Sequence, residues 1–451
     1  MKRLVAMISV LALMAFLACQ VSLAGYSDLP DPGVLAAAAI LADAKTGELL
    51  FEKNIHARRM PASLTKMMTC ILALEHAEKS GCMDEIVTVT ESSLVGMAPD
   101  GSMQGLKPGE ELTYRDLVYC AMIASANDGC NVLAEYISGS VDAFVAAMNA
   151  RAEAIGMSDS HFVNTHGLPD PDHYSTAFDI YLLCREAMKN KTFMDMAHTE
   201  TYTVPPTNLK PEGRTLNTTN RLISKRTSPE YLYPHARGIK TGHTIEAGYC
   251  LASSADKDGV ALISVVLGAE REESGIIRSF VETKELFEWG FDNFTHKRLL
   301  AKTEVIASVP LIQGLNSDSV ELVPAEEITA LVPRSVSPEN INRVVKVFEP
   351  DGALAPILKG QVMGTLSLNL EGRDFGTVNL VAMTAEERDE AQKVLDDFFE
   401  VVSEPWIKWA VAGVVAAIVL YIAITIMYNV HRRKKLRTGY SSYKGKKRHR
   451  R

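Results

Sequence analysis

Ser63 and Lys66 stand three positions apart at the start of an apolar stretch, a spacing that puts both side chains on one face of a helix. A serine hydroxyl is a weak nucleophile until a neighbouring group takes its proton. A lysine takes that proton only where burial or a second cation lowers its pKa. Free backbone N–H groups at a helix start can also stabilise an oxyanion. The pair therefore predicts a serine nucleophile with a lysine base.

Ser125 and Asn127 follow about sixty residues later, where a helical stretch over residues 114–136 is expected to break. A hydroxyl and an amide two residues apart project to the same side of an extended turn. There they could relay a proton and hold Lys66 in position. Taken alone, however, Ser-x-Asn is far more typical of a helix cap.

Lys240, Thr241 and Gly242 form a third group on an expected strand, with His243 next in the chain. The glycine permits close approach of the backbone. A second cation near Lys66 would lower the pKa of that base and would attract a carboxylate of the substrate.

The first and third patterns occur again elsewhere in the chain, so neither is specific by itself. Ser254 and Lys257 repeat the first spacing at an expected hairpin turn, and Ser441 and Lys444 repeat it in a basic tail. The Lys-Thr-Gly tripeptide at residues 45–47 is expected to be the turn of an earlier hairpin.

The order and separation of the three groups are specific, and they resemble the three-part signature of penicillin-recognising serine enzymes. Four further segments, residues 42–47, 164–168, 241–250 and 359–364, are similar to low-molecular-weight penicillin-binding proteins, the serine-type D-alanyl-D-alanine carboxypeptidases. The resemblance covers roughly residues 25–383.

The resemblance implies a role for each catalytic candidate. Ser63 would be the acylated nucleophile and Lys66 its general base. Ser125 would pass the proton toward the leaving D-alanine, and Asn127 would hold Lys66 and the substrate amide. No metal or cofactor is implied.

The implied substrate-binding residues are Lys240, Thr241, Gly242 and His243. Lys240 and Thr241 would read the terminal carboxylate, and the backbone N–H groups of Ser63 and His243 would form the oxyanion hole. A supporting role for Arg278 in carboxylate binding rests on a loose alignment.

The implied reaction removes the terminal D-alanine from the peptidoglycan pentapeptide through an acyl-enzyme, and β-lactams would acylate the same serine. A transpeptidase or endopeptidase would use the same acyl-enzyme, so these alternatives stay open. A β-lactamase is disfavoured because the stretch after Asn127 shows Asp159 and Asn164 but no Glu-x-x-x-Asn there. A non-catalytic wall-binding protein is disfavoured because every catalytic residue type is present.

The predicted fold class is α/β: a penicillin-recognising catalytic domain over residues 25–296, then a β-sandwich-like domain over residues 297–383. The patterns predict a hairpin over residues 34–52, a buried helix over residues 64–79, two strands over residues 248–267 and a closing helix over residues 274–289. An acidic amphipathic helix capped by Thr384 begins a stalk over residues 384–405.

The two ends predict export and membrane anchoring. Residues 1–24 have the pattern of a signal peptide, with a less favoured alternative in which Cys19 is lipidated. Residues 406–430 predict a transmembrane helix, and residues 431–451 carry eleven Lys or Arg and no acid. The positive tail should stay in the cytoplasm, which places the catalytic domain outside the cell. Many relatives instead use an amphipathic helix on the membrane surface, so their anchoring cannot be transferred to this chain.

Charge and cysteine content exclude several other classes. The chain carries a net charge of −8; the tail with Lys2 and Arg3 accounts for +13, which leaves −21 on the rest. Such a surface disfavours nucleic acid as a partner. Seven cysteines are too few for a disulfide scaffold, and no spacing predicts a zinc site. Four of the cysteines, at positions 70, 120, 130 and 184, are predicted to be core thiols.

Overall fold

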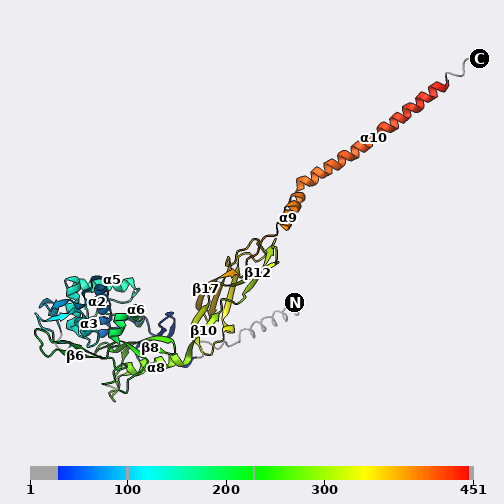
Figure 1. Ribbon diagram of the computed structural model, residues 1–451. Coiled ribbons are helices and arrows are strands. Elements are labelled where there is room, and N and C mark those ends of the chain that lie inside the picture. The colour runs from blue at the N-terminus through cyan, green and yellow to red at the C-terminus, as the bar shows by residue number, and fades with distance from the viewer. Residues whose placement is uncertain (1–28, 98–100, 227–228, 446–451) are drawn as a thin grey trace, which may run out of the picture. The chain divides into compact units, whose positions relative to one another are not determined.

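A computed structural model describes residues 29–97, 101–226 and 229–445 (Figure 1). The chain divides into two compact units. The first comprises Met1–Leu299, Thr329–Ile341 and Leu370–Gly372, and the second comprises Leu300–Ile328, Asn342–Asn369 and Arg373–Arg451. The predicted signal peptide lies outside the described residues.

A five-stranded antiparallel sheet forms the centre of the first unit, in the order β2-β1-β9-β8-β7. Its strands are β1 (Ala38–Asp43), β2 (Leu49–Lys53), β7 (Ala236–Thr244), β8 (Gly248–Lys257) and β9 (Val260–Ala269). The predicted hairpin near the N-terminus and the predicted pair of strands over residues 248–267 are both confirmed. Asp258 and Gly259 join β8 to β9, and both have positive φ, as the favoured two-residue hairpin turn requires.

Both faces of this sheet are buried, because side chains along a strand alternate between its two faces. In β1, Ile40 packs into one apolar core and Leu41 into another. Helix α8 (Arg278–Asn293) covers the second face, where its Gly290 leaves room for the side chains of Leu41 and Leu262. The closing helix is thus confirmed, although it starts four residues later than predicted.

The other face is covered by a group of helices, two of which supply Lys66 and Asn127 to the site (Figure 1). They are α2 (Lys66–Ser80), α3 (Tyr114–Met122), α4 (Asn127–Ser138), α5 (Val141–Ala154), α6 (Ala177–Met188) and α7 (Lys191–Ala197). Apolar residues around the whole circumference of α2 predict burial, and most of its side chains are buried. The predicted break between α3 and α4 is present.

Three small sheets complete the first unit. They pair β3 (Ile86–Thr88) with β4 (Glu111–Thr113), β5 (Thr201–Val204) with β6 (Arg214–Asn217), and β10 (Phe294–Leu300) with β13 (Ile328–Pro333). The β5–β6 hairpin matters for the site because its second strand leads into residues that line the cleft.

The second unit is β-rich, as predicted. Its six-stranded sheet has the order β14-β16-β17-β12-β11-β15. The strands are β11 (Ala307–Ile312), β12 (Ser319–Pro324), β14 (Asn342–Val347), β15 (Ala353–Leu354), β16 (Val362–Leu370) and β17 (Arg373–Ala382).

The predicted cap of the amphipathic helix is wrong. Helix α9 spans Glu390–Ser403, and its N-cap is Asp389, whose carboxylate accepts hydrogen bonds from the N–H groups of Ala391 and Gln392. Thr384 lies at a bend in the segment between β17 and α9. That segment is held by paired backbone hydrogen bonds between Glu386 and Ile357, which compete with helix formation.

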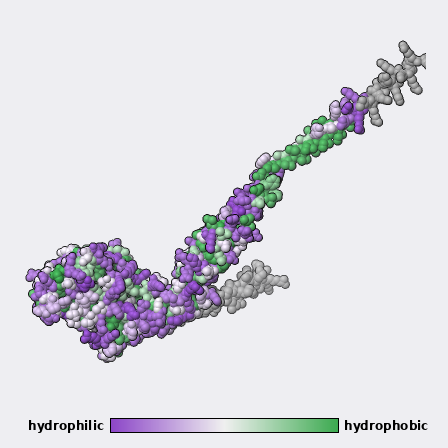
Figure 2. All heavy atoms as spheres, in the orientation of Figure 1, coloured by the Kyte–Doolittle hydropathy of each residue, from purple (hydrophilic) through white to green (hydrophobic). Residues whose placement is uncertain are grey.

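Helix α10 (Pro405–Gly445) contains one stretch, Pro405–Lys435, that is long and apolar enough to cross a membrane. Figure 2 shows its apolar surface ending at a hydrophilic segment. Among the described residues it is the single helix that meets this test.

The six described cysteines are all free and buried. They include the four predicted core thiols, together with Cys82 and Cys250, for which the sequence makes no assignment.

Candidate active site

Ser63 lies on the 3-10 turn Ala62–Thr65, directly before α2. Lys66 is the first residue of α2 and is fully buried. Its Nζ donates to Ser63 Oγ over 2.7 Å and to the backbone oxygen of His166 over 2.8 Å. The amine therefore stands in direct contact with the hydroxyl that it would have to deprotonate.

A loop over residues 164–168 braces this turn. Asn164 Oδ1 accepts hydrogen bonds from the N–H groups of His166 and Gly167, and Asn164 Nδ2 donates to the oxygen of Leu168. Gly167 has φ +89°, and a Cβ there would come within 1.8 Å of the oxygen of Ala62. Only glycine permits this approach, so the loop can present the His166 oxygen to Lys66.

A buried histidine supports the turn from behind. Val163 N–H donates to His173 Nδ1, so Nε2 carries the proton and donates to Thr65 Oγ1 over 2.8 Å. Thr65 Oγ1 in turn donates to the oxygen of Ala62 over 2.8 Å. Burial lowers the pKa of His173 to about 4, so this neutral form persists at ordinary pH. The chain of bonds holds Ala62, whose φ is +48°, next to Ser63.

Ser125 and Asn127 come from the break between α3 and α4. Ser125 adopts a left-handed φ of +57°, and its Oγ accepts a hydrogen bond of 3.0 Å from Lys240 Nζ. Asn127 begins α4, and its backbone N–H donates to the oxygen of Ser102 over 2.7 Å. Among the described residues no hydrogen bond joins the side chains of Asn127 and Lys66.

Strand β7 carries Lys240 to Ser125 and brings its own backbone to Ser63. Lys240 is buried and also donates to the oxygen of Thr241 over 3.1 Å. A Cβ on Gly242 would lie 3.0 Å from the oxygen of Pro61 and 3.1 Å from Ser63 N. The strand therefore passes very close to the nucleophile turn, and a larger residue would push the two apart. The side chain of His243 stacks on Tyr249.

Burial sets the charge of the two lysines. Loss of water is the largest cause that lowers the pKa of Lys66, to about 8. The pKa of Lys240 falls to about 7, again chiefly through burial and then through repulsion from Lys66. The expected effect of a second cation is therefore present, but it acts on Lys240 and is smaller than desolvation.

Two cavities flank Ser63. The larger, about 480 Å³, is lined by Asn127, His166, Leu168, His243 and Glu246 among others. The smaller, about 240 Å³, is lined by residues that include Ser125, Thr219, Arg221, Thr241 and Gly242. Ser63, Ser102 and His243 line both. A substrate can thus extend to either side of the hydroxyl.

Some residues of the cleft carry no signal in the sequence. Thr219 Oγ1 lies 2.6 Å from Thr241 Oγ1, and Arg221 supplies a guanidinium to the smaller cavity. Arg278 instead forms ion pairs with three glutamates at positions 272, 282 and 285 and lines neither cavity. Arg221 is therefore the better candidate to support carboxylate binding.

The second occurrences of the motifs lie away from this cleft. Ser254 is buried within β8, not at the turn, and Lys257 pairs with Glu288. Side chains three apart on a strand point to opposite faces, so this pair cannot act as Ser63 and Lys66 do. Residues 44–46 form the predicted turn between β1 and β2.

Comparison with known proteins gives two family matches. Residues 27–271 match the model described as D-alanyl-D-alanine carboxypeptidase, and residues 294–388 match the C-terminal domain of penicillin-binding protein 5.

Individual relatives agree with these matches. The chain is 34% identical to the D-alanyl-D-alanine carboxypeptidase DacF of Bacillus subtilis over 75% of its length and 82% of that protein. It is 32% identical to DacC of Escherichia coli, over 82% of this chain and 88% of the relative. The crystal structure of penicillin-binding protein 5 from Haemophilus influenzae superposes with a TM-score of 0.62 at 28% identity, over 80% of this chain and 100% of that one.

The lowered pKa of Lys66 predicts the pH dependence of Ser63 reactivity. The neutral amine accepts the proton, and a pKa of about 8 makes it available well below the ordinary value of 10.5. Labelling of Ser63 by an uncharged fluorophosphonate should therefore rise with pH and reach half its maximum near pH 8. The rate of adduct formation, followed by mass spectrometry, measures this.

Ser63→Ala is the control and should give no adduct at any pH. A labelling rate that is independent of pH, or that reaches half its maximum only near pH 10, would contradict the assignment of Lys66 as the base.

Proposed function

Because the chain belongs to the D-alanyl-D-alanine carboxypeptidase family of serine peptidases, we propose that it removes the terminal D-alanine from peptidoglycan pentapeptides through an acyl-enzyme on Ser63. The contact of 2.7 Å between Lys66 Nζ and Ser63 Oγ is the observation that carries this assignment. It joins a nucleophile to a buried base of lowered pKa in a cleft with room on both sides.

The acylation step follows from these contacts. Neutral Lys66 accepts the hydroxyl proton as Ser63 Oγ attacks the carbonyl carbon of the penultimate D-alanine. The backbone N–H groups of Ser63 and His243 stabilise the resulting oxyanion, and the close passage of β7 at Gly242 supports this pairing. The peptide bond then breaks, and the leaving amine receives, through Ser125, the proton that Lys66 had accepted, which returns Lys66 to its neutral form.

Lys240 and Thr241 bind the terminal carboxylate in this proposal. The hydroxyl of Thr241 faces the smaller cavity beside Thr219 and Arg221. An arriving carboxylate favours the ammonium form of Lys240, whose pKa is lowered to about 7 in the free site. Asn127 lines the larger cavity, where its amide can meet the acyl part of the peptide.

Deacylation needs a water molecule in place of the departed D-alanine. Lys66 takes one proton from that water as its oxygen attacks the ester carbonyl, and Ser63 leaves with a proton returned from Lys66. In a transpeptidase an amine would attack the ester in place of water, so the two activities differ in the group that attacks the acyl-enzyme. The Glu-x-x-x-Asn pattern of common β-lactamases occurs here at Glu186 to Asn190, but Glu186 pairs with Arg151 and Lys189 and neither end of the pattern lines a cavity beside Ser63. Its position favours slow release of a penicilloyl group.

Release of D-alanine tests the reaction. The purified protein should convert a pentapeptide ending in D-Ala-D-Ala to the tetrapeptide with one equivalent of free D-alanine, and Ser63→Ala should reduce the rate by at least roughly 1000-fold. Penicillin should leave a stoichiometric adduct on the peptide that contains Ser63. Mass spectrometry of the products and the adduct measures both.

Ser254→Ala is the matched control, since Ser254 repeats the spacing to a lysine, and it should keep both activities. An adduct on Ser254, or rapid turnover of penicillin, would contradict the proposal.

The proposed role of Lys240 predicts selectivity for a free carboxylate. A charge-assisted hydrogen bond contributes roughly 1.5–3 kcal/mol, so a peptide ending in D-Ala-D-Ala should exceed its C-terminal amide by more than about tenfold in kcat/KM. Lys240→Ala should erase most of this preference and slow acylation by penicillin. Steady-state kinetics of two enzymes on two substrates measure it.

If the wild-type enzyme cleaves the acid and the amide equally, Lys240 does not recognise the terminal carboxylate. An endopeptidase role would then gain support.

We further propose that the protein is a single-pass membrane protein. In this arrangement residues 1–24 are a signal peptide, residues 25–296 and 297–383 are the two extracytoplasmic domains, and residues 384–405 form the stalk. Residues 406–430 cross the membrane and residues 431–451 remain in the cytoplasm. The apolar stretch within α10 and the eleven basic residues at positions 431–451 support this orientation.

Protease accessibility tests the orientation. Protease added to intact cells should degrade the portion over residues 25–402 and spare an epitope placed after Arg451, because the membrane shields the tail. Immunoblotting with and without permeabilisation measures it. Loss of the epitope from intact cells would show that the tail faces outward.

A further inference from the structure

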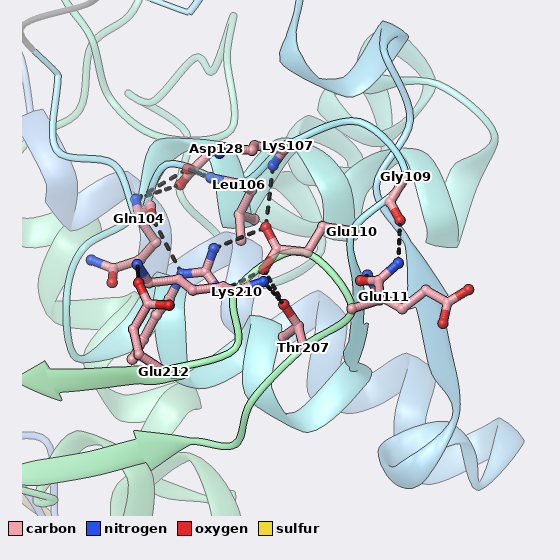
Figure 3. A network of polar contacts seen from close by, with 12 residues as sticks. Gln104, Leu106, Lys107, Gly109, Glu110, Glu111, Asp128, Thr207, Lys210 and Glu212 are labelled. Atoms are coloured by element: carbon pink, nitrogen blue, oxygen red, sulfur yellow. Dashed lines mark hydrogen bonds and ion pairs between the residues drawn. The ribbon is translucent and has the colours of Figure 1, made fainter.

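A buried ion pair lies beside the cleft in the first unit. Arg214 of β6 donates through Nη1 to Glu110 Oε1 over 2.6 Å and through Nη2 to Glu110 Oε2 over 2.8 Å. The two side chains are only 4% and 1% exposed, and Thr207 Oγ1 adds a third hydrogen bond to Glu110. Figure 3 shows the Glu110 carboxylate at the centre of this network.

The pair fastens the loop that precedes β4. Arg214 Nε donates to the backbone oxygen of Gln104 over 3.2 Å, while the N–H of Lys107 donates to Glu110 Oε2. From the opposite side, the carboxylate of Asp128 accepts hydrogen bonds from the N–H groups of Gln104 and Leu106 (Figure 3). Residues 104–107 are therefore held from two directions by buried charge.

This loop reaches the reacting groups through Ser102. The oxygen of Ser102 accepts the backbone N–H of Asn127 over 2.7 Å, and Ser102 Oγ donates to the oxygen of Ala124. Ser102 itself lines both cavities beside Ser63. Movement of the loop would therefore displace the start of α4 and Ser102, one of the residues that line both cavities.

The other partner of the ion pair belongs to the opposite wall. Strand β6 ends at Asn217, and the chain continues to Thr219, whose hydroxyl meets Thr241, and to Arg221 in the smaller cavity. The ion pair thus connects the Ser102 loop to the segment that lines the proposed carboxylate pocket.

Stability alone does not account for a charged pair at this position. Replacing a buried ion pair by apolar residues of similar volume is often neutral or stabilising. What apolar residues cannot supply is the fixed fork geometry of arginine, which binds both oxygens of Glu110 and the oxygen of Gln104 at once. Burial would raise the pKa of the Glu110 carboxyl, but hydrogen bonds from Arg214 and Thr207 outweigh it and hold the pKa below the ordinary value.

We propose that Glu110 and Arg214 are positioning residues, which set the geometry of Asn127 and Ser102 for the acyl-transfer reaction without touching the substrate. The inference rests on the proposed function and deepens it. Because orientation acts mainly on the reacting complex, its loss lowers kcat more than it raises KM.

The test compares three variants of the full chain: Arg214→Met, Glu110→Leu and the double variant. The single variants leave one buried charge without its partner and should lose thermal stability. The double variant removes both charges and should regain that stability. All three should lose roughly tenfold to a hundredfold in kcat for D-alanine release, with KM changed less than about threefold.

Arg151→Met is the matched control. Arg151 forms two partly buried ion pairs, one with Glu75 and one with Glu186, and it lines neither cavity. It should lose thermal stability and keep kcat when assayed well below its melting temperature.

The double variant decides the question even where a single variant fails to fold. Recovered stability with a low kcat supports a positioning role, whereas recovered stability with the wild-type kcat would overturn it. A loss of kcat in Arg151→Met as large as in the double variant would also overturn it. An inactive wild-type enzyme would instead contradict the proposed function, so the two failures are distinguishable.

Discussion

The burial of two lysine side chains is the constraint around which the first unit is organised. Lys66 and Lys240 are both buried, and each donates to one serine hydroxyl and one backbone oxygen. Burial opposes the charged form of both lysines. Each amine therefore needs a backbone oxygen within hydrogen-bond distance, and these oxygens belong to His166 and Thr241. This need explains why the loop over residues 164–168 and strand β7 both lie against the start of α2.

Convergence of this kind depends on the absence of two side chains. The loop over residues 164–168 approaches Ala62 because Gly167 has no Cβ, and β7 approaches Ser63 because Gly242 has none. The central sheet keeps these close backbone approaches fixed, since β7 is hydrogen-bonded to β8 and packed against buried layers on both faces. Flexible connections could bring the same groups together but could not keep them desolvated.

The sequence predicted the parts of this arrangement that depend on short-range pattern. Ser63 with Lys66, the break at Ser125 and the hairpin that ends in β9 follow from local spacing and periodicity. Residues such as His173 and Thr219 could not be predicted, because only the folded chain brings them to the site. The cap at Thr384 was wrong because pairing between Glu386 and Ile357, distant in sequence, decides where α9 begins. Burial, similarly, is the largest cause that lowers the pKa of both lysines, whereas repulsion from a neighbouring cation lowers only that of Lys240, and burial is a property of the whole fold.

The order of strands in the central sheet has a consequence for how the chain folds. Strand β1 is an interior strand of the sheet and pairs with β9, so residues near position 40 find their partners only near position 265. A ribosome makes the N-terminal hairpin first, and the two faces of β1 stay uncovered while more than two hundred further residues are added. Contacts so distant in sequence slow folding and prolong the exposure of apolar strands. Assembly of the cleft is therefore a late event, and the interval before it is when the apolar strands are most exposed to aggregation.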